Sequence, residues 1–181
     1  MSANLCKELK TYDWKSVLRL GNNLGEFNDE QWRFLKALII ELATEKYSNS
    51  KLKYVGAKHK DFDSASGHSV ELKSQFSETF YKNNGQLRKT FNVKFNNSMG
   101  TNNNDVLPDD HVCDYLILMR RDGVCLIDRK TIMKKSVKKG DGFMLVLEAS
   151  DLVEITGKVK VDDTVDLELK GKIMNFLRSA I

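Results

Sequence analysis

The middle of the chain contains the stretch His59-Lys60-Asp61-Phe62-Asp63-Ser64-Ala65-Ser66-Gly67-His68-Ser69-Val70-Glu71-Leu72-Lys73-Ser74-Gln75-Phe76. In its second half apolar and polar residues alternate, which predicts a β-strand with Val70 and Leu72 facing a core. Glu71 and Lys73 then share the opposite face. The serines and glycine before this strand predict a turn, so we expect the segment around Asp61 to return beside Glu71.

Further strands are predicted on the C-terminal side of this stretch. The run 113–119 is almost continuously apolar, which is typical of a strand buried on both faces. Arg121-Asp122-Gly123 predicts a hairpin turn into a strand over 124–127. Alternating or apolar runs predict other extended segments at 54–55, 90–96, 143–147 and 152–161.

Helical spacing of apolar residues predicts helices at both ends of the chain. The first covers 3–20 and ends at Gly21. The second begins after an N-cap at Asn28 and has an apolar stripe made of Trp32, Leu35, Leu38, Ile39 and Leu42. A short basic helix is expected at 131–139 and a last helix at 164–180. This order of elements predicts a mixed α/β fold.

Length and composition limit the class of protein. A chain of 181 residues suits one domain with its own core, so we expect a single domain over 1–181, with a helical N-terminal part at 1–47, a core at 52–150 and a C-terminal strand and helix at 151–181. The 29 basic and 25 acidic residues permit a polyanionic partner without requiring one. Three cysteines without a C-x-x-C pair exclude a disulfide framework or a zinc set. No apolar run is long enough to span a bilayer.

Asp61, Glu71 and Lys73 are the residues that we expect to carry chemistry. Two adjacent carboxylates suit Mg²⁺, which binds through one or two carboxylates, water and substrate phosphate. The main-chain carbonyl of Leu72 is a further expected ligand. An amine one pleat from Glu71 can orient or deprotonate a water and offset charge on a phosphate during phosphodiester hydrolysis. Glu-Leu-Lys also occurs at 8–10 and 168–170, so the strand context and Asp61 carry this prediction.

The run from Asp61 to Val70-Glu71-Leu72-Lys73-Ser74 resembles the signature of the PD-(D/E)XK nuclease superfamily. Its ten-residue gap and glycine turn are similar to those of certain blunt-cutting type II restriction endonucleases. The resemblance covers about residues 30–130, and Lys60 stands where the family often has proline. It implies a restriction-endonuclease-like mixed central β-sheet flanked by α-helices, and Mg²⁺-dependent cleavage of double-stranded DNA by a homodimer that leaves 5′-phosphates. By family role, Asp61 and Glu71 bind metal and Lys73 positions water.

A second set of residues fits the same bare pattern. Asp114, or Asp109, is followed across the predicted hairpin by Asp128-Arg129-Lys130. Arg129 stands where the pattern normally has a core-facing residue, and the other two lie at a strand end beside a basic run. We therefore expect the first set to be the site, with Asp114, Asp128 and Lys130 as the alternative.

Three other acids are left open by the sequence. Asp63 would point to the same side of an extended segment as Asp61, so it is a smaller alternative as metal ligand. Glu41 and Glu45 lie in the second predicted helix, and the sequence does not decide whether they approach the metal site. The N-terminal helices are also the candidate dimer elements.

An asparagine-rich region follows the predicted catalytic strand. Asparagine can form paired hydrogen bonds with adenine in the major groove, and lysine or arginine can contact phosphate or guanine. The candidate DNA-binding residues are Arg88, Lys89, Asn92, Lys94, Asn96, Asn102 and Asn103. The basic run of Lys134, Lys135, Lys138 and Lys139 is expected to contact phosphate or to serve solubility.

The sequence therefore predicts a Mg²⁺-dependent, site-specific DNA endonuclease of the type II restriction class. We expect it in the bacterial cytoplasm, as a homodimer without membrane association, and the family resemblance implies a companion DNA methyltransferase. Two other interpretations stay open. One is a repair or junction nuclease of the same fold, and the other is a non-catalytic DNA-binding module in which Glu71 and Lys73 form a surface pair.

Overall fold

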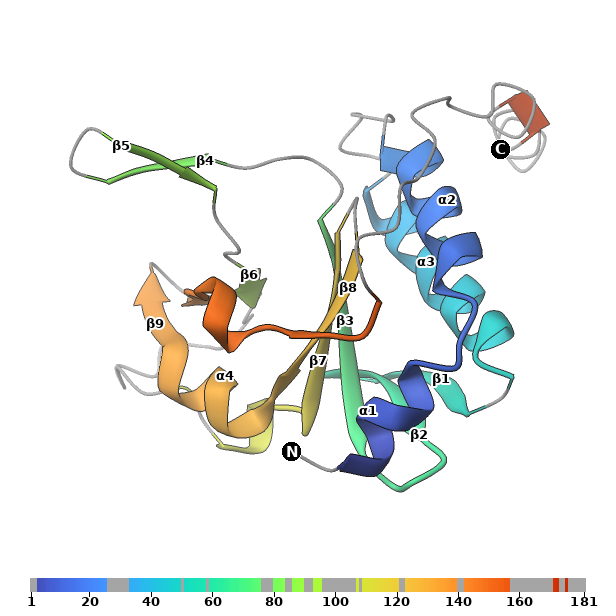
Figure 1. The fold of residues 1–181 in the computed structure, drawn as a ribbon, viewed down its shortest axis with the longest axis horizontal. Helices are drawn as coiled ribbons and strands as arrows, with labels where there is room; N and C mark the ends of the chain where they lie inside the picture. The colour runs from blue at the N-terminus through green and yellow to red at the C-terminus, as the bar shows by residue number, and fades with distance from the viewer. Residues whose placement is uncertain are drawn as a thin grey trace.

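A six-stranded β-sheet forms the centre of the molecule (Figure 1). The computed structural model describes residues 3–25, 33–49, 51–57, 59–75, 80–83, 86–89, 93–95, 107, 109–120, 123–139, 142–156, 171, 172 and 175. The strands follow the spatial order β1 (Leu52–Ala57), β2 (Lys60–Ser64), β3 (Ser69–Gln75), β7 (Tyr115–Arg120), β8 (Gly123–Asp128) and β11 (Val153–Glu154).

The sheet is mixed, because β3 and β7 are parallel while every other neighbouring pair in it is antiparallel. Together with the flanking helices this confirms the α/β class. The predicted strand over 113–119 is β7, and its first five residues are buried, as expected of a strand covered on both faces. Arg120 lies opposite Gly123, so β7 and β8 form the predicted hairpin.

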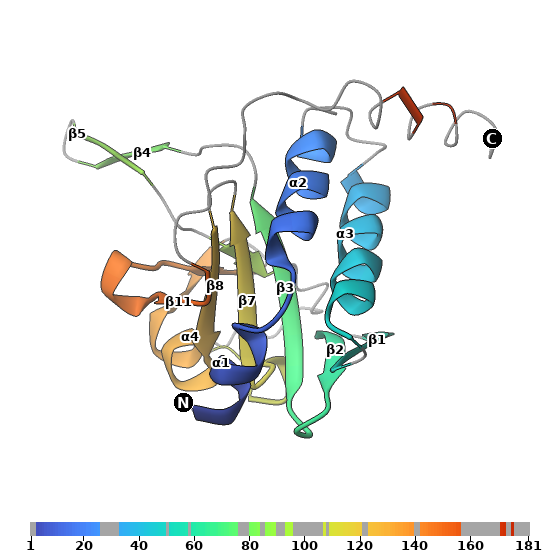
Figure 2. The same ribbon diagram turned by 45° about the vertical axis from the view of Figure 1, so that its right-hand side comes forward.

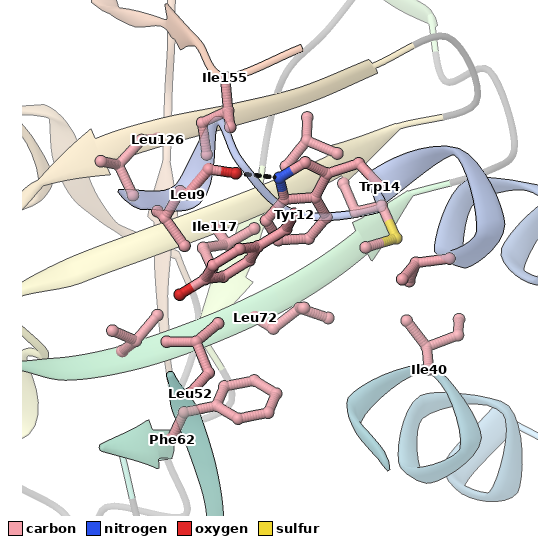
Figure 3. Packing of buried hydrophobic residues seen from close by; sticks show 14 of the residues in the cluster. Leu9, Tyr12, Trp14, Ile40, Leu52, Phe62, Leu72, Ile117, Leu126 and Ile155 are labelled. Atoms are coloured by element: carbon pink, nitrogen blue, oxygen red, sulfur yellow. Dashed lines mark hydrogen bonds between the residues drawn. The ribbon is translucent and has the colours of Figure 1, made fainter. Parts of the chain in front are cut away.

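Three helices cover one face of the sheet. They are α1 (Ala3–Leu9), α2 (Trp14–Gly25) and α3 (Arg33–Tyr47), and α2 and α3 lie side by side (Figure 2). Trp14 and Tyr12 pack against the sheet residues Leu72 and Ile117, and the indole N–H donates to the Leu9 carbonyl (Figure 3). Each such side chain contributes about 1.5–3 kcal/mol when fully buried, so this core anchors the face of β3 opposite Glu71.

The other face carries a second core. Leu116 and Leu118 of β7 pack there with Ile132 of α4 (Arg129–Lys135) and with Phe143. A three-stranded sheet of β6 (Val93–Phe95), β10 (Gly142–Leu145) and β9 (Ser136–Lys139) lies on this side, and β4 (Phe80–Asn83) and β5 (Gln86–Lys89) form a separate hairpin. Two short 3₁₀ turns are η2 (Asp109–His111) and η3 (Ala149–Asp151). Within the described residues, no helix combines the length and apolar character needed to cross a membrane.

The first predicted helix was wrong in both its length and its end. Residues 10–13 separate α1 from α2, and the Asp13 carboxylate accepts from the main-chain N–H of Ser16 at the start of α2. The helix then continues through Gly21, which is buried, to Gly25. A glycine inside a helix costs about 1 kcal/mol relative to alanine, and packing of α2 against α3 outweighs that cost.

The predicted apolar stripe of α3 was confirmed at Ile39, which packs against the first core, and wrong at two other positions. Leu38 and Leu42 are 37% and 45% exposed, while Ile40, Ala43 and Thr44 are buried. The neighbours α2 and β1 determine which face of α3 is covered, and helical spacing alone does not contain that information. Asn28 and Trp32 lie outside the described residues, as does the side chain of Leu35.

The predicted basic helix over 131–139 was wrong in its second half. It is α4 to Lys135, and Ser136 then begins β9, which pairs with β10. The Ser136 N–H and hydroxyl both bond to the Ile132 carbonyl, so the chain leaves the helix at that residue. The predicted strands at 90–96, 143–147 and 152–161 overlap β6, β10 and β11, and positions 90–92, 96 and 157–161 lie outside the described residues. Of the predicted helix at 164–180, the structure describes only positions 171, 172 and 175, which are helical.

Candidate active site

Asp61 of β2 and Glu71 of β3 lie at neighbouring positions of the sheet. The register aligns Phe62 with Val70 and Asp63 with Ser69, and one further step places Asp61 beside Glu71. There the Leu72 N–H donates to Asp61 Oδ2 at 2.7 Å. The Asp61 carboxylate thus takes the place of a main-chain acceptor. It is bonded to Leu72, the residue that stands between Glu71 and Lys73 in β3.

Lys73 and Glu71 are joined by an ion pair, in which the ammonium donates to Glu71 Oε1. Glu71 is 9% exposed, whereas 33% of the Lys73 side chain is exposed. Their neighbours in β7 are Leu116 and Leu118, so the pair lies on the face of the second core. The predicted alternation is confirmed, because Val70 and Leu72 lie in the first core.

The charges at this point of the sheet act strongly on one another. Burial, and then repulsion by Glu71, raise the pKa of Asp61 to about 6, although the Leu72 N–H and Lys73 act in the opposite direction. Burial by itself would lower the pKa of Lys73, but its attraction to Glu71, Asp61 and Glu41 outweighs burial and raises that pKa. The site therefore brings together carboxylates that repel each other and an ammonium that partly compensates them.

The main chain of Leu72 adds a further oxygen to this arrangement. In a β-strand the N–H and C=O of one residue point toward the same neighbouring strand. Because the Leu72 N–H reaches Asp61, its carbonyl is directed to the same side. The expected third oxygen ligand therefore has a suitable orientation.

Glu41 of α3 also approaches the site, which the sequence had left undecided. Burial, and then repulsion by Asp61, raise the pKa of Glu41, while a hydrogen bond with Tyr54 and the charge of Lys73 lower it in part. Glu45 faces elsewhere, since its Oε1 accepts from the main-chain N–H of Tyr54 at 3.0 Å. Spacing along α3 would not have distinguished these two acids, because they are four residues apart on one helix face.

The donor set fits a hard divalent cation with few protein ligands. No group of three or more His, Cys, Asp or Glu side chains is arranged to hold a metal ion in the part of the chain that the structure describes. Asp61 and Glu71 each have one oxygen engaged, and a carboxylate has about four acceptor positions in all. Two carboxylates and a carbonyl suit Mg²⁺, which retains several waters, better than Zn²⁺, which prefers three or four protein ligands.

The alternative set has structural roles instead. Asp114 Oδ2 accepts from the N–H and the hydroxyl of Ser69, both at 2.9 Å, and thereby ties β7 to the start of β3. Asp128 is the N-cap of α4, where it accepts from the Thr131 N–H, and Lys130 is exposed in the first turn of that helix. Arg129 does not enter the core but bonds to carbonyls near η2 and pairs with Asp109.

The smaller alternative, Asp63, is engaged in another contact, and a thiol near the site is unreactive. Asp63 pairs with Lys60 at 2.6 Å, away from the Leu72 N–H that holds Asp61. Cys113 is a buried free thiol next to Glu71, and burial raises its pKa to about 12, so it is not an activated nucleophile. Cys6, Cys113 and Cys125 are all free thiols.

The candidate DNA-binding residues fall on separate elements. Arg88 and Lys89 belong to β5, which pairs with β4, while Lys94 belongs to β6 and aligns with Met144 of β10. The basic run is also divided between α4 and β9, and Lys135 within it pairs with Asp151 at 3.1 Å. Four candidates lie outside the described residues, namely Asn92, Asn96, Asn102 and Asn103.

A scan against protein-family models, a search of curated proteins and a search of solved structures find no match to this chain. The interpretation of the site therefore depends on the arrangement of Asp61, Glu71 and Lys73 described above.

Proposed function

We propose that this chain is a Mg²⁺-dependent endonuclease that hydrolyses phosphodiester bonds of double-stranded DNA, with a restriction-endonuclease-like fold and PD-(D/E)XK chemistry. The observation that carries the proposal is the meeting of Asp61, Glu71 and Lys73 in a mixed sheet, with Asp61 held on the main chain between the other two. The raised pKa of Asp61 supports it, because strong charge coupling in a half-buried group is common at functional sites.

Each residue has a distinct role in the proposed reaction. Magnesium bound there would polarise a phosphoryl oxygen and lower the pKa of a coordinated water. Asp61 and Glu71 supply carboxylate ligands and Leu72 supplies its carbonyl. Lys73, which stays an ammonium, positions the attacking water and stabilises the charge that builds on the phosphate. Glu41 of α3 adds a negative charge that interacts with Asp61 and Lys73.

The resemblance extends the proposal to a site-specific type II enzyme that acts as a homodimer, leaves 5′-phosphates and has a companion methyltransferase. Two copies supply one active site for each DNA strand, which matches a palindromic recognition sequence. Leu38 and Leu42, exposed on α3 at helical spacing, are the apolar pair that we assign to dimer contact. Sedimentation of the free protein and of a Leu42→Lys variant checks this assignment, since a monomeric wild-type protein would contradict it.

The test is cleavage of mixed plasmid DNA with and without Mg²⁺. Discrete bands identify a site-specific nuclease and smearing a nonspecific one. Cleavage restricted to mismatched or branched DNA identifies a repair or junction nuclease, and a mobility shift without cleavage identifies a binding module.

Lys73→Ala should abolish cleavage while DNA binding persists. The matched control is Lys60→Ala in β2, because Lys60 pairs with Asp63 rather than with the site, and it should cut normally. Wild-type cleavage by Lys73→Ala would remove Lys73 from the mechanism.

A further inference from the structure

Tyr54 of β1 lies directly over the main chain of Gly56. The pairing of β1 with β2 is irregular between Tyr54 and Ala57, and Gly56 has a positive φ of 53° within this irregular segment. A Cβ atom at position 56 would lie 2.7 Å from the Tyr54 hydroxyl oxygen and 2.9 Å from Cζ, well inside van der Waals contact. Glycine therefore leaves the space in which the tyrosine hydroxyl sits.

Other contacts limit the freedom of the same tyrosine. Its ring packs edge-on against Phe62 of β2, with ring centroids 6.0 Å apart and planes at 70°. Its main-chain N–H donates to Glu45 Oε1 of α3 at 3.0 Å. Tyr54 is thus fixed by β2 on one side and by α3 on the other, so its hydroxyl has a narrow range of positions.

The Tyr54 side chain acts on Glu41 as a hydrogen-bonding partner, which lowers the pKa of the Glu41 carboxyl and raises that of the tyrosine. Glu41 needs such a partner, because Asp61 repels its carboxylate and a glutamate side chain otherwise has considerable rotamer freedom. A hydroxyl whose position is limited by these contacts offsets both effects. Polar groups that orient the side chains around a metal typically change metal affinity by about 10–100-fold when removed.

We propose that Tyr54 is a positioning residue, whose hydroxyl, seated over Gly56, holds the Glu41 carboxylate toward Asp61 and Lys73 and so strengthens divalent-cation binding. The inference rests on the proposed Mg²⁺ site and adds to it a support that the catalytic motif does not contain. Tyr54 itself touches neither DNA nor the reacting atoms in this scheme. Its effect passes through Glu41.

Titration of the full-length protein with Mg²⁺ alone, followed by NMR, tests the inference without DNA. The Leu72 amide is the reporter, because it bonds to Asp61 Oδ2. Tyr54→Phe keeps the ring against Phe62 and removes only the hydroxyl, and we expect it to bind Mg²⁺ about tenfold more weakly. Tyr47→Phe, at the end of α3, is the matched control and should titrate like the wild type.

Cleavage kinetics separate positioning from a purely structural role. Tyr54→Phe should need about tenfold more Mg²⁺ for half-maximal rate and should recover a near-wild-type kcat at saturating Mg²⁺. Gly56→Ala, which crowds the hydroxyl but leaves it present, should move the Mg²⁺ dependence in the same direction. Wild-type Mg²⁺ affinity in Tyr54→Phe would overturn the role of Tyr54 while leaving the proposed nuclease intact. A wild-type protein that binds no Mg²⁺ would overturn the proposed function, and this inference with it.

Discussion

Residues 61–73 and residues 114–130 carry the same side-chain types in the same order, an acid followed by an acid-x-lysine element. In the first segment Glu71 and Lys73 lie within β3, where side chains two residues apart share a face. In the second, β8 ends at Asp128 and Lys130 already belongs to α4, where such side chains do not face each other. The two sequence patterns are nearly identical, but the change from β8 to α4 after Asp128 prevents the second from bringing its acid and lysine together.

The two segments also differ in what satisfies their carboxylates. Against the effect of their burial, hydrogen bonds from Ser69 lower the pKa of Asp114, and hydrogen bonds from Thr131 lower that of Asp128. Burial and another carboxylate raise the pKa of Asp61 instead. At Asp114 and Asp128 the hydrogen-bond donors outweigh burial, so the ionised acids stabilise the fold. At Asp61 the Leu72 N–H and Lys73 do not fully offset burial and the repulsion by Glu71, so a bound cation would stabilise the ionised acid further. The following predictions test this contrast, from the largest effect to the smallest.

Glu71→Gln and Asp128→Asn provide the most direct comparison. Glu71→Gln removes one of two carboxylate charges at the proposed metal site, and we expect plasmid cleavage to fall by about 10³-fold. Asn is as good an N-cap as Asp, so Asp128→Asn should keep α4 and cut at near the wild-type rate. Initial rates under saturating Mg²⁺ measure both. The reverse outcome, with only Asp128→Asn inactive, would move the site to the second segment.

Asp61→Asn should stabilise the metal-free protein while destroying its activity. The folded-state pKa of about 6 lies above the ordinary value of 3.8, so folding becomes less favourable as pH rises between these two values. After a discount for solvent screening, we expect the variant to gain about 1 kcal/mol in unfolding free energy at pH 8 and to lose this advantage below about pH 4. Urea denaturation at the two pH values measures the difference. A variant less stable than wild type at pH 8 would contradict the inferred repulsion.

Asp128→Ala should have the opposite sign and a comparable or smaller size. Loss of the N-cap of α4 typically costs about 1 kcal/mol of unfolding free energy. Because the folded pKa of Asp128 is lowered, this contribution is present above its ordinary pKa and is lost as pH falls through the folded value. Denaturation at pH 7 and near pH 2 measures it, with Asp128→Asn as the control. Equal stability of both variants at pH 7 would show that the cap contributes nothing.

Local patterns in the sequence were sufficient for the strands around the site. Alternation identified β3 and its two faces, and a continuous apolar run identified β7, because both depend on a two-residue period. The turn before β3 also placed Asp61 beside Glu71, since an antiparallel return determines which residues meet. These features are set by neighbouring residues of one chain segment, so they could be read without the fold.

Tertiary structure alone decided the parts that depend on packing between distant segments. Which face of α3 is buried, and which of Glu41 and Glu45 approaches the site, both follow from how α3 lies against α2, β1 and β3. The three-to-four-residue spacing of apolar side chains shows that a helix has a buried face, but it does not show which element covers that face. The sequence by itself thus determined the strand that carries Glu71 and Lys73. The fold determined which charges surround these two residues, because electrostatic coupling depends on distances that only packing creates.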